Sequence, residues 1–249
     1  MTKTFKSLAL VAITTLLMGA MASCSSEDEK KGLEFKTPGQ DSVALFHNDT
    51  HQLEFNGRDG SALVIAVKDT LVAKISPEGM ITAGLVGKTQ YTITQGSSTL
   101  KGIIEVKPRY TSFAEPLYEP KSTTRKAVFD YEKREYKYSM PFGETDSLIV
   151  FKDKTEGLAN ALYIYHTPKD YMKQAIITFK TAEAFKKHNV VEFLKERYPF
   201  VGYSKVLTDV DEKPAPMFQK GKKIIKAAVS MGQPAIFYQD VDEDNKGQE

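Results

Sequence analysis

The chain has 249 residues, a formal net charge of +2, a single cysteine and no tryptophan. Charge so close to balance provides no global electrostatic attraction to nucleic acid, and we therefore expect no nucleic-acid partner. Lys3 and Lys6 account for the excess, so the chain that follows the N-terminal segment is neutral. That remaining chain is long enough for one large or two ordinary domains.

The N-terminal segment has the three parts of an export signal. Lys3 and Lys6 supply positive charge, and Leu8 to Met21 is apolar but shorter than the roughly 20 residues that a membrane helix needs. It ends in Met21-Ala22-Ser23-Cys24, with small residues directly before the cysteine. This pattern resembles the signal peptide and lipobox of a bacterial lipoprotein, which implies cleavage after residue 23 and acylation (palmitate) of Cys24. The alternatives are an ordinary cleavable signal peptide with an incidental cysteine and a transmembrane anchor.

Residues 24–33 form an acidic tether. The run Ser25-Ser26-Glu27-Asp28-Glu29-Lys30-Lys31 resembles the export signal of Bacteroidetes lipoproteins that reach the outer face of the outer membrane, although such a run is also typical of a solvated, disordered tether. Two or three acyl chains hold a protein on a membrane essentially permanently. Acylation of Cys24 leaves no thiol, which excludes disulfides, thiol catalysis and cysteine metal sites. We expect a lipid-anchored outer-membrane protein exposed at the cell surface, with the membrane as one partner.

Residues 34–107 contain short β-prone runs separated by turn residues, a pattern that predicts a β-sandwich or barrel. The run Ala62 to Val67 is apolar on both faces, which predicts a central strand. Pro77-Glu78-Gly79 predicts a turn in which glycine adopts a positive φ.

The stretch from Asp69 to Thr94 is the most diagnostic part of this region. It combines a "VA-x-I" strand, a turn glycine, an "I-T-A" strand and a second glycine, at Val72, Ala73, Ile75, Gly79, Ile81, Thr82, Ala83 and Gly87. This stretch resembles the bacterial immunoglobulin-like domains of group 2 (BIG2-like), although the tryptophan that often precedes the signature is absent. The resemblance implies an Ig-like sandwich over 34–107, of a kind that commonly serves as a stalk or spacer.

Residues 108–125 contain Pro108, Pro116 and Pro120 and have no hydrophobic periodicity, which predicts a semi-rigid linker. Residues 126–241 then predict an α+β domain with a mainly antiparallel sheet, and 242–249 an acidic, polar tail. The chain as a whole is therefore predicted to be mainly β with two domains.

Within the α+β domain, strands are predicted near Tyr136, Tyr138 and Met140, and over 148–151, 162–165, 174–179, 200–206 and 235–238. Residues 181–198 predict the main helix, capped by Thr181 and ended by Pro199, with Asn189 as a point at which it could split. Residues 222–231 fit either a helix or a strand.

None of the four histidines shows a catalytic or metal-binding pattern. His47 and His51 have the i, i+4 spacing of a helical metal site, but their turn-like surroundings favour a surface loop. His166 and His188 have no nucleophile partner visible in the sequence. The acidic run from Asp240 to Asp244 lacks the glycine and glutamate of a calcium loop. We expect no cofactor and no metal.

Two surface chemistries stay open. The many tyrosines could stack on sugars, but packing in the core and across strands is their commoner use. The triplets beginning at Asp41, Asp69 and Asp146 resemble the O-glycosylation motif of Bacteroidetes, which makes Ser42, Thr70 and Ser147 candidate sites.

The sequence therefore predicts a noncatalytic surface lipoprotein in which an Ig-like stalk presents an α+β domain that binds a protein or glycan or takes part in assembly. One alternative is an envelope hydrolase with a site built from His166, His188 and scattered carboxylates. The other is an accessory subunit of a larger outer-membrane complex.

Overall fold

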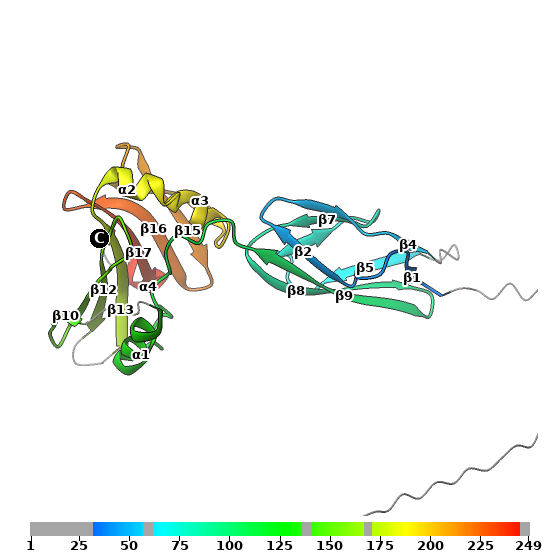
Figure 1. The fold of residues 1–249 in the computed structure, drawn as a ribbon, viewed down its shortest axis with the longest axis horizontal. Coiled ribbons are helices and arrows are strands. Elements are labelled where there is room, and N and C mark those ends of the chain that lie inside the picture. Colours follow the sequence, from blue (N-terminus) through cyan, green and yellow to red (C-terminus); the bar gives the residue numbers. More distant parts are fainter. Residues whose placement is uncertain (1–31, 57–61, 136–140, 167–170, 245–249) are drawn as a thin grey trace, which may run out of the picture.

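The computed structural model describes residues 32–56, 62–135, 141–166 and 171–244. Figure 1 shows two parts arranged end to end along the long axis of the molecule and joined by the segment that follows β9. Each part has its own hydrophobic core, one built from residues 33–106 and the other from residues 113–238. The predicted mainly β fold, with an Ig-like sandwich followed by an α+β part, is confirmed.

The first part is a sandwich of two sheets. One sheet has the order β2-β9-β8-β5 and the other β3-β7-β6, with the short pair β1-β4 beside them. The strand bounds are β1 Glu34–Phe35, β2 Ser42–Phe46, β3 Thr50–Gln52, β4 Phe55–Asn56, β5 Leu63–Val67, β6 Ala73–Ile75, β7 Met80–Ala83, β8 Gly87–Gln95 and β9 Ser98–Lys107. β2 runs parallel to β9, and the other pairings are antiparallel. This division into two sheets is that of an immunoglobulin-type fold.

Local turn chemistry explains several of these elements. Gly79 has a φ of +89° in the turn between β6 and β7, as the Pro-Glu-Gly triplet predicts. The prediction of a central strand at 62–67 is wrong, because β5 lies at the edge of its sheet and leaves Val64 60% exposed. Strand order depends on pairing with distant segments, so apolar composition alone did not determine it.

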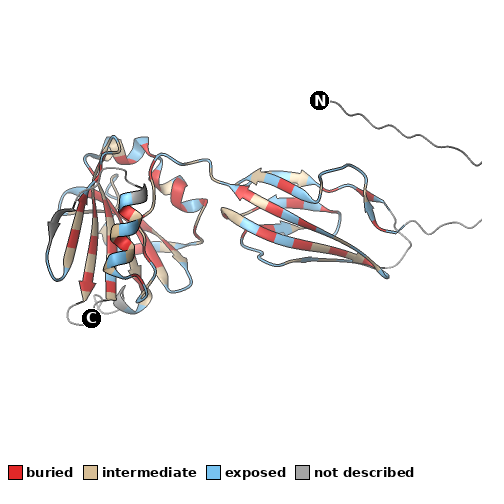
Figure 2. Cartoon of the chain, turned by 60° about the horizontal axis from the view of Figure 1, so that its bottom comes forward, coloured by how far each residue is buried: buried red, intermediate tan, exposed pale blue. Residues whose placement is uncertain are grey.

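The second part is built on one antiparallel sheet of order β10-β11-β12-β13-β17-β16-β15-β14. Its strands are β10 Pro141–Glu144, β11 Leu148–Lys152, β12 Leu158–His166, β13 Tyr171–Phe179, β14 Phe200–Thr208, β15 Pro214–Lys220, β16 Lys223–Ser230 and β17 Gln233–Asp240. The helices are α1 Arg125–Glu135, α2 Ala182–Lys187, α3 Val190–Lys195 and α4 Val241–Asp244. In Figure 2, buried and exposed residues alternate along many of these strands, as expected of a sheet with two unequal faces.

The helical region after β13 divides at the residue that the sequence indicates. Thr181 caps α2, its hydroxyl accepting a hydrogen bond from the backbone N–H of Ala184 at 3.1 Å. Asn189 has a φ of +51°, which ends one helix and starts the next. Asparagine adopts this left-handed conformation more readily than most residues. The ambiguous segment 222–231 forms the strand β16 and the turn after it.

The segment after β9 is more than a linker. Its Phe113 and Tyr118 are buried in the core of the second part, so this proline-containing segment covers the sheet as well as connecting the two parts. It leads into α1, a helix that the sequence reasoning missed. Thr124 accepts a hydrogen bond from the N–H of Ala127 at 3.2 Å, which is a local N-cap signal that could have identified it. The strand pattern at Tyr136, Tyr138 and Met140 lies outside the described residues.

Candidate binding surface

The edge strand β14 carries a concentration of exposed apolar side chains. Phe200 is 48% exposed, Tyr203 61% and Val206 71%, and Val201 is exposed to a similar degree. β14 is the last strand of the sheet as far as the described residues extend. Large apolar side chains that gather on one exposed strand indicate an interaction surface, whereas isolated ones do not.

A hollow of about 430 Å³ lies beside this strand. Its lining comes from α3, from β14 and from the start of β15, with two residues of the loop between these strands. The lining residues are Val191, Lys195, Phe200, Tyr203, Asp209, Lys213, Pro214 and Pro216. The rings of Phe200 and Tyr203 meet edge to face with their centroids 5.1 Å apart, and Phe200 also packs edge to face on the buried Phe218. The apolar wall of the hollow is thus anchored in the core.

Proline chemistry explains why this end of the sheet is irregular. Pro214 and Pro216 have no backbone N–H to give to a ladder. The pairing of β15 with β16 begins only at Met217, and the register between β14 and β15 shifts between Tyr203 and Thr208. In this irregular stretch the hydroxyl of Ser204 accepts hydrogen bonds from the N–H groups of Val206 and Leu207. The sequence reasoning did not identify β15, because prolines usually count against a strand.

Two of the charged side chains that line the hollow are already bonded to other groups. Lys195 pairs with Glu192 at 2.7 Å. Asp209 accepts hydrogen bonds through Oδ1 from the backbone N–H groups of Asp211 at 2.8 Å and Lys213 at 3.1 Å, so this oxygen serves the loop itself. Lys195 is therefore already paired, and Lys213 is the lysine of the lining for which the described residues show no salt bridge.

A joint made of hydrogen bonds around Glu196 connects the two parts next to this surface. Glu196, 1% exposed, accepts hydrogen bonds through its carboxylate from the N–H groups of Arg109 at 2.9 Å and Tyr110 at 3.2 Å. The carbonyl of Glu196 accepts a hydrogen bond from Val86 of the sandwich at 2.6 Å. The guanidinium of Arg197 donates to the Glu196 carboxylate and to the Tyr110 carbonyl. This joint therefore ties the end of α3 both to the connecting segment and to the Ig-like part.

A salt bridge across the joint adds a second contact between the parts. Arg109 binds Asp49 of the sandwich at 2.5 Å and lies over the ring of Phe46, 4.7 Å from its centroid. A hollow of about 310 Å³ next to the joint is lined by Leu71 and Leu85 from the sandwich and by Pro199 from the second part. Sequence reasoning could not find this joint, because the residues that form it are distant in the chain.

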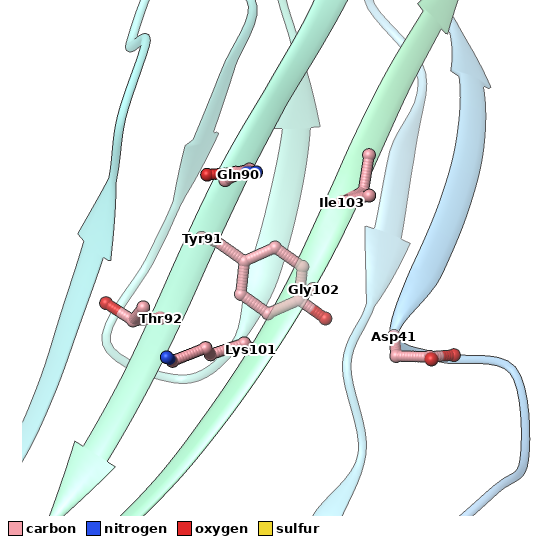
Figure 3. A pocket seen from close by; sticks show the side chains of 7 residues that line it. All are labelled: Asp41, Gln90, Tyr91, Thr92, Lys101, Gly102 and Ile103. Carbon is pink, nitrogen blue, oxygen red and sulfur yellow. The ribbon is translucent and has the colours of Figure 1, made fainter.

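The Ig-like part has two further hollows on its four-stranded sheet. Figure 3 shows the first, of about 450 Å³, in which the ring of Tyr91 lies over Gly102 and Asp41 stands at the side. The second, of about 540 Å³, shares Gln90 and Ile103 with the first. Burial, and then the nearby Asp41 carboxylate, raise the pKa of Tyr91 to about 12. The hydroxyl of Tyr91 donates to the carbonyl of Gln40 at 2.8 Å, so this polar group is committed to the fold.

The structure does not bring His166 and His188 together. His166 is the last residue of β12, whereas His188 Nε2 donates to the carbonyl of Glu156, two residues before that strand begins, at 2.7 Å. The nine-residue strand spans on the order of 27 Å, at about 3.3 Å per residue. A hydrolase site that needs both histidines is therefore wrong for this fold.

His188 does have a hydroxyl partner that the sequence did not reveal. Its Nδ1 lies 2.9 Å from the hydroxyl oxygen of Ser112, and its ring packs edge to face on Phe113. Both ring nitrogens of His188 are therefore engaged in hydrogen bonds, Nε2 as a donor to the Glu156 carbonyl and Nδ1 with the Ser112 hydroxyl. The imidazole is buried and neither residue lines any of the four hollows described above. We interpret the pair as a pin that holds the connecting segment against the sheet.

The other candidate residues occupy ordinary positions. His47 Nδ1 lies 2.7 Å from the carbonyl oxygen of Gly84, and His51 belongs to β3 rather than to a loop. Ser42, Thr70 and Ser147 are all exposed. Cys24 lies outside the described residues. Within the described part of the chain, no three histidine, cysteine or acidic side chains are grouped to hold a metal, and no helix is long and apolar enough to cross a membrane.

No family profile and no curated protein matches the chain. Similar solved structures include an EHEC O157:H7 intimin mutant, with 16% identity, 52% of this chain and 78% of that chain covered and a TM-score of 0.23. Human protocadherin-24 EC1-2 has 10% identity, coverages of 82% and 91% and a TM-score of 0.26. A quinonprotein alcohol dehydrogenase-like protein from Bacteroides thetaiotaomicron has 10% identity, coverages of 80% and 48% and a TM-score of 0.26. At these scores no function is transferred from them.

Proposed function

We propose that the protein is a noncatalytic lipoprotein of the outer membrane, anchored through Cys24, whose α+β part binds a partner at the surface formed by β14 and its hollow. The Ig-like part acts as the stalk. Ser42 and Thr70 are glycosylation sites on the Ig-like part, and Ser147 is one on the α+β part. The motif around Cys24 and the acidic run behind it support the anchor and the destination.

The observation that carries the binding role is the exposure of four large apolar side chains on β14, Phe200, Val201, Tyr203 and Val206. Burying one such side chain is worth about 1.5–3 kcal/mol. Their exposure beside a lined hollow is therefore what a surface that associates with a partner requires. An accessory subunit of a larger complex would use the same surface.

The joint at Glu196 supports the stalk role. A spacer holds its head in a defined direction only where the connection between them is fixed. Glu196 binds both the connecting segment and the sandwich, and Arg197 binds Glu196 and the connecting segment. A joint of this kind sets the direction in which β14 faces relative to the sandwich.

The binding role is tested in intact cells with a photo-crosslinking amino acid in place of Tyr203 in the full-length lipoprotein. We expect a discrete covalent adduct after irradiation. The matched control places the crosslinker at Met231, which is fully exposed in a turn of the same sheet and should give no adduct. Absence of an adduct at Tyr203, or equal labelling at Met231, would count against the role.

The anchor is tested separately by fractionation. Cys24→Ala should move the protein from the membrane fraction to the soluble fraction, since apolar burial of the acyl chains is the attachment. Retention of the variant in the membrane after its signal is cleaved would remove the lipoprotein proposal.

A further inference from the structure

We propose that the partner is a protein that offers an extended peptide segment, with an apolar side chain for the hollow beside β14 and a neighbouring carboxylate for its lysines. This inference rests on the proposed binding function and specifies the chemistry of what is bound. It draws on three features of the surface: its backbone edge, its lining and its charge.

Within the described residues, no strand pairs with the outer side of β14 at Phe200. The N–H of Gln219 donates to the carbonyl of Pro199 at 2.9 Å, while Phe200 stands directly opposite Phe218. In an antiparallel ladder this arrangement makes Phe200 and Phe218 a non-hydrogen-bonded pair. The N–H and C=O of Phe200 therefore point away from β15, toward the edge of the sheet. An extended peptide is the ligand whose own backbone matches such groups.

The lining selects an apolar side chain. Five of the eight lining residues are apolar or aromatic, namely Val191, Phe200, Tyr203, Pro214 and Pro216, and about 430 Å³ lies within the range of small-ligand sites. The lining has no asparagine, glutamine or histidine, and Oδ1 of its single carboxylate, on Asp209, already accepts two backbone hydrogen bonds. A sugar needs several such neutral or acidic groups for its hydroxyls, so the wall favours an apolar side chain over a glycan.

The lysines at this surface favour a peptide with an acidic side chain. Lys213 lines the hollow, and Lys205 is exposed on β14 itself, which carries no acidic residue between Phe200 and Thr208. Lys195, the other lysine of the lining, is already paired with Glu192. A second copy of the chain would bring β14 against an equally basic strand. A carboxylate on the incoming segment complements this surface and would also speed association.

The probe is a displayed library of random nine-residue peptides, selected against the full-length lipoprotein in lipid nanodiscs. We expect enrichment of peptides that combine large apolar residues with Asp or Glu. Tyr203→Ser and Lys213→Glu should each weaken the selected peptides at least about tenfold. Met231→Ser, at an exposed apolar residue that does not line the hollow, should leave their affinity unchanged. All three positions are at the surface, and thermal unfolding of each variant verifies the fold.

Several results would overturn the inference. These are enrichment of basic or purely polar peptides, binding that is indifferent to Tyr203 and Lys213, or a dimer in solution that Tyr203→Ser dissociates. If no peptide were enriched but a crosslinked adduct formed at Tyr203 in cells, the proposed binding function would stand. The inference that the ligand is an extended peptide would then be refuted. Failure of both would remove the proposed function itself.

Discussion

The ring of Tyr91 occupies the space that a side chain at Gly102 would need. The two residues stand directly opposite each other on β8 and β9, and a Cβ added at Gly102 would lie 2.5 Å from Cζ and Oη of the tyrosine. Gly102 has an ordinary φ, so the requirement for glycine here is one of space alone. The hollow in Figure 3 lies over this pair.

Gly102→Ala should therefore destabilise the Ig-like part by about 1–3 kcal/mol, the usual cost of overpacking a core. Urea unfolding measures the change. Lys101→Ala, one position along on the exposed face of β9, should change the free energy of unfolding by less than about 0.5 kcal/mol. Equal effects of the two substitutions would contradict the close packing of Tyr91 on Gly102.

Glu196→Gln should destabilise the joint by about 3 kcal/mol, as removal of one partner from a buried ion pair does. The amide cannot accept from Arg109 and Tyr110 with the strength of a carboxylate. Among the described residues, the Arg197 guanidinium also loses the nearer of its two carboxylate neighbours and keeps only Glu115, at 3.7 Å. The control is Glu192→Gln, which removes an exposed pair with Lys195 and should cost less than about 1 kcal/mol. Denaturant unfolding of both variants checks the difference, and a similar small loss in each would argue against the joint.

His188→Ala should cost about 2–4 kcal/mol, because it leaves a cavity beside Phe113 and frees the hydroxyl of Ser112 and the carbonyl of Glu156. The adjacent Lys187→Ala removes only an exposed pair with Glu156 and serves as the control. Thermal unfolding followed by circular dichroism distinguishes them. If His188→Ala unfolded like the wild type, the pin would have no role in holding the connecting segment.

Alkaline pH should weaken the fold through Tyr91. Its folded-state pKa of about 12 exceeds its ordinary value of 10.0, so between these values the tyrosine ionises only in the unfolded chain. The stability it supports is complete below pH 10 and falls as pH rises toward 12, by at most about 1.4 kcal/mol per pH unit. Urea unfolding from pH 8 to about pH 11.5 should show a smaller decline for Tyr91→Phe. Parallel curves for the two proteins would refute the assignment.

Local chemistry in the sequence predicted those elements whose signals lie within a few residues. The Thr181 cap follows from a hydroxyl that binds the nearby backbone, and the left-handed Asn189 and the turn at Gly79 follow from the backbone conformations that these residue types adopt readily. The N-cap at Thr124 likewise indicates α1, but the prolines before it favour a linker. Prolines also concealed β15.

Features that depend on contacts between segments far apart in the chain could not be predicted from the sequence. The edge position of β5, the burial of Phe113 and Tyr118 and the joint at Glu196 each join segments far apart in the chain. The surface at β14 is an intermediate case. Residues 200–206 were predicted as a strand, but only the sheet order shows that this strand is an edge and that its apolar side chains are exposed.

The parallel pairing of β2 with β9 has a mechanical consequence. A pull between an anchored N-terminus and a bound head would draw β2 toward its start and β9 toward its end, at Ser42 and Lys107 respectively. Because the strands run in the same direction, these forces slide one along the other and load all five residue pairs together. An antiparallel hairpin pulled at its open end would instead open one pair at a time. The pairing of β2 with β9 is thus arranged to resist shear under such a load.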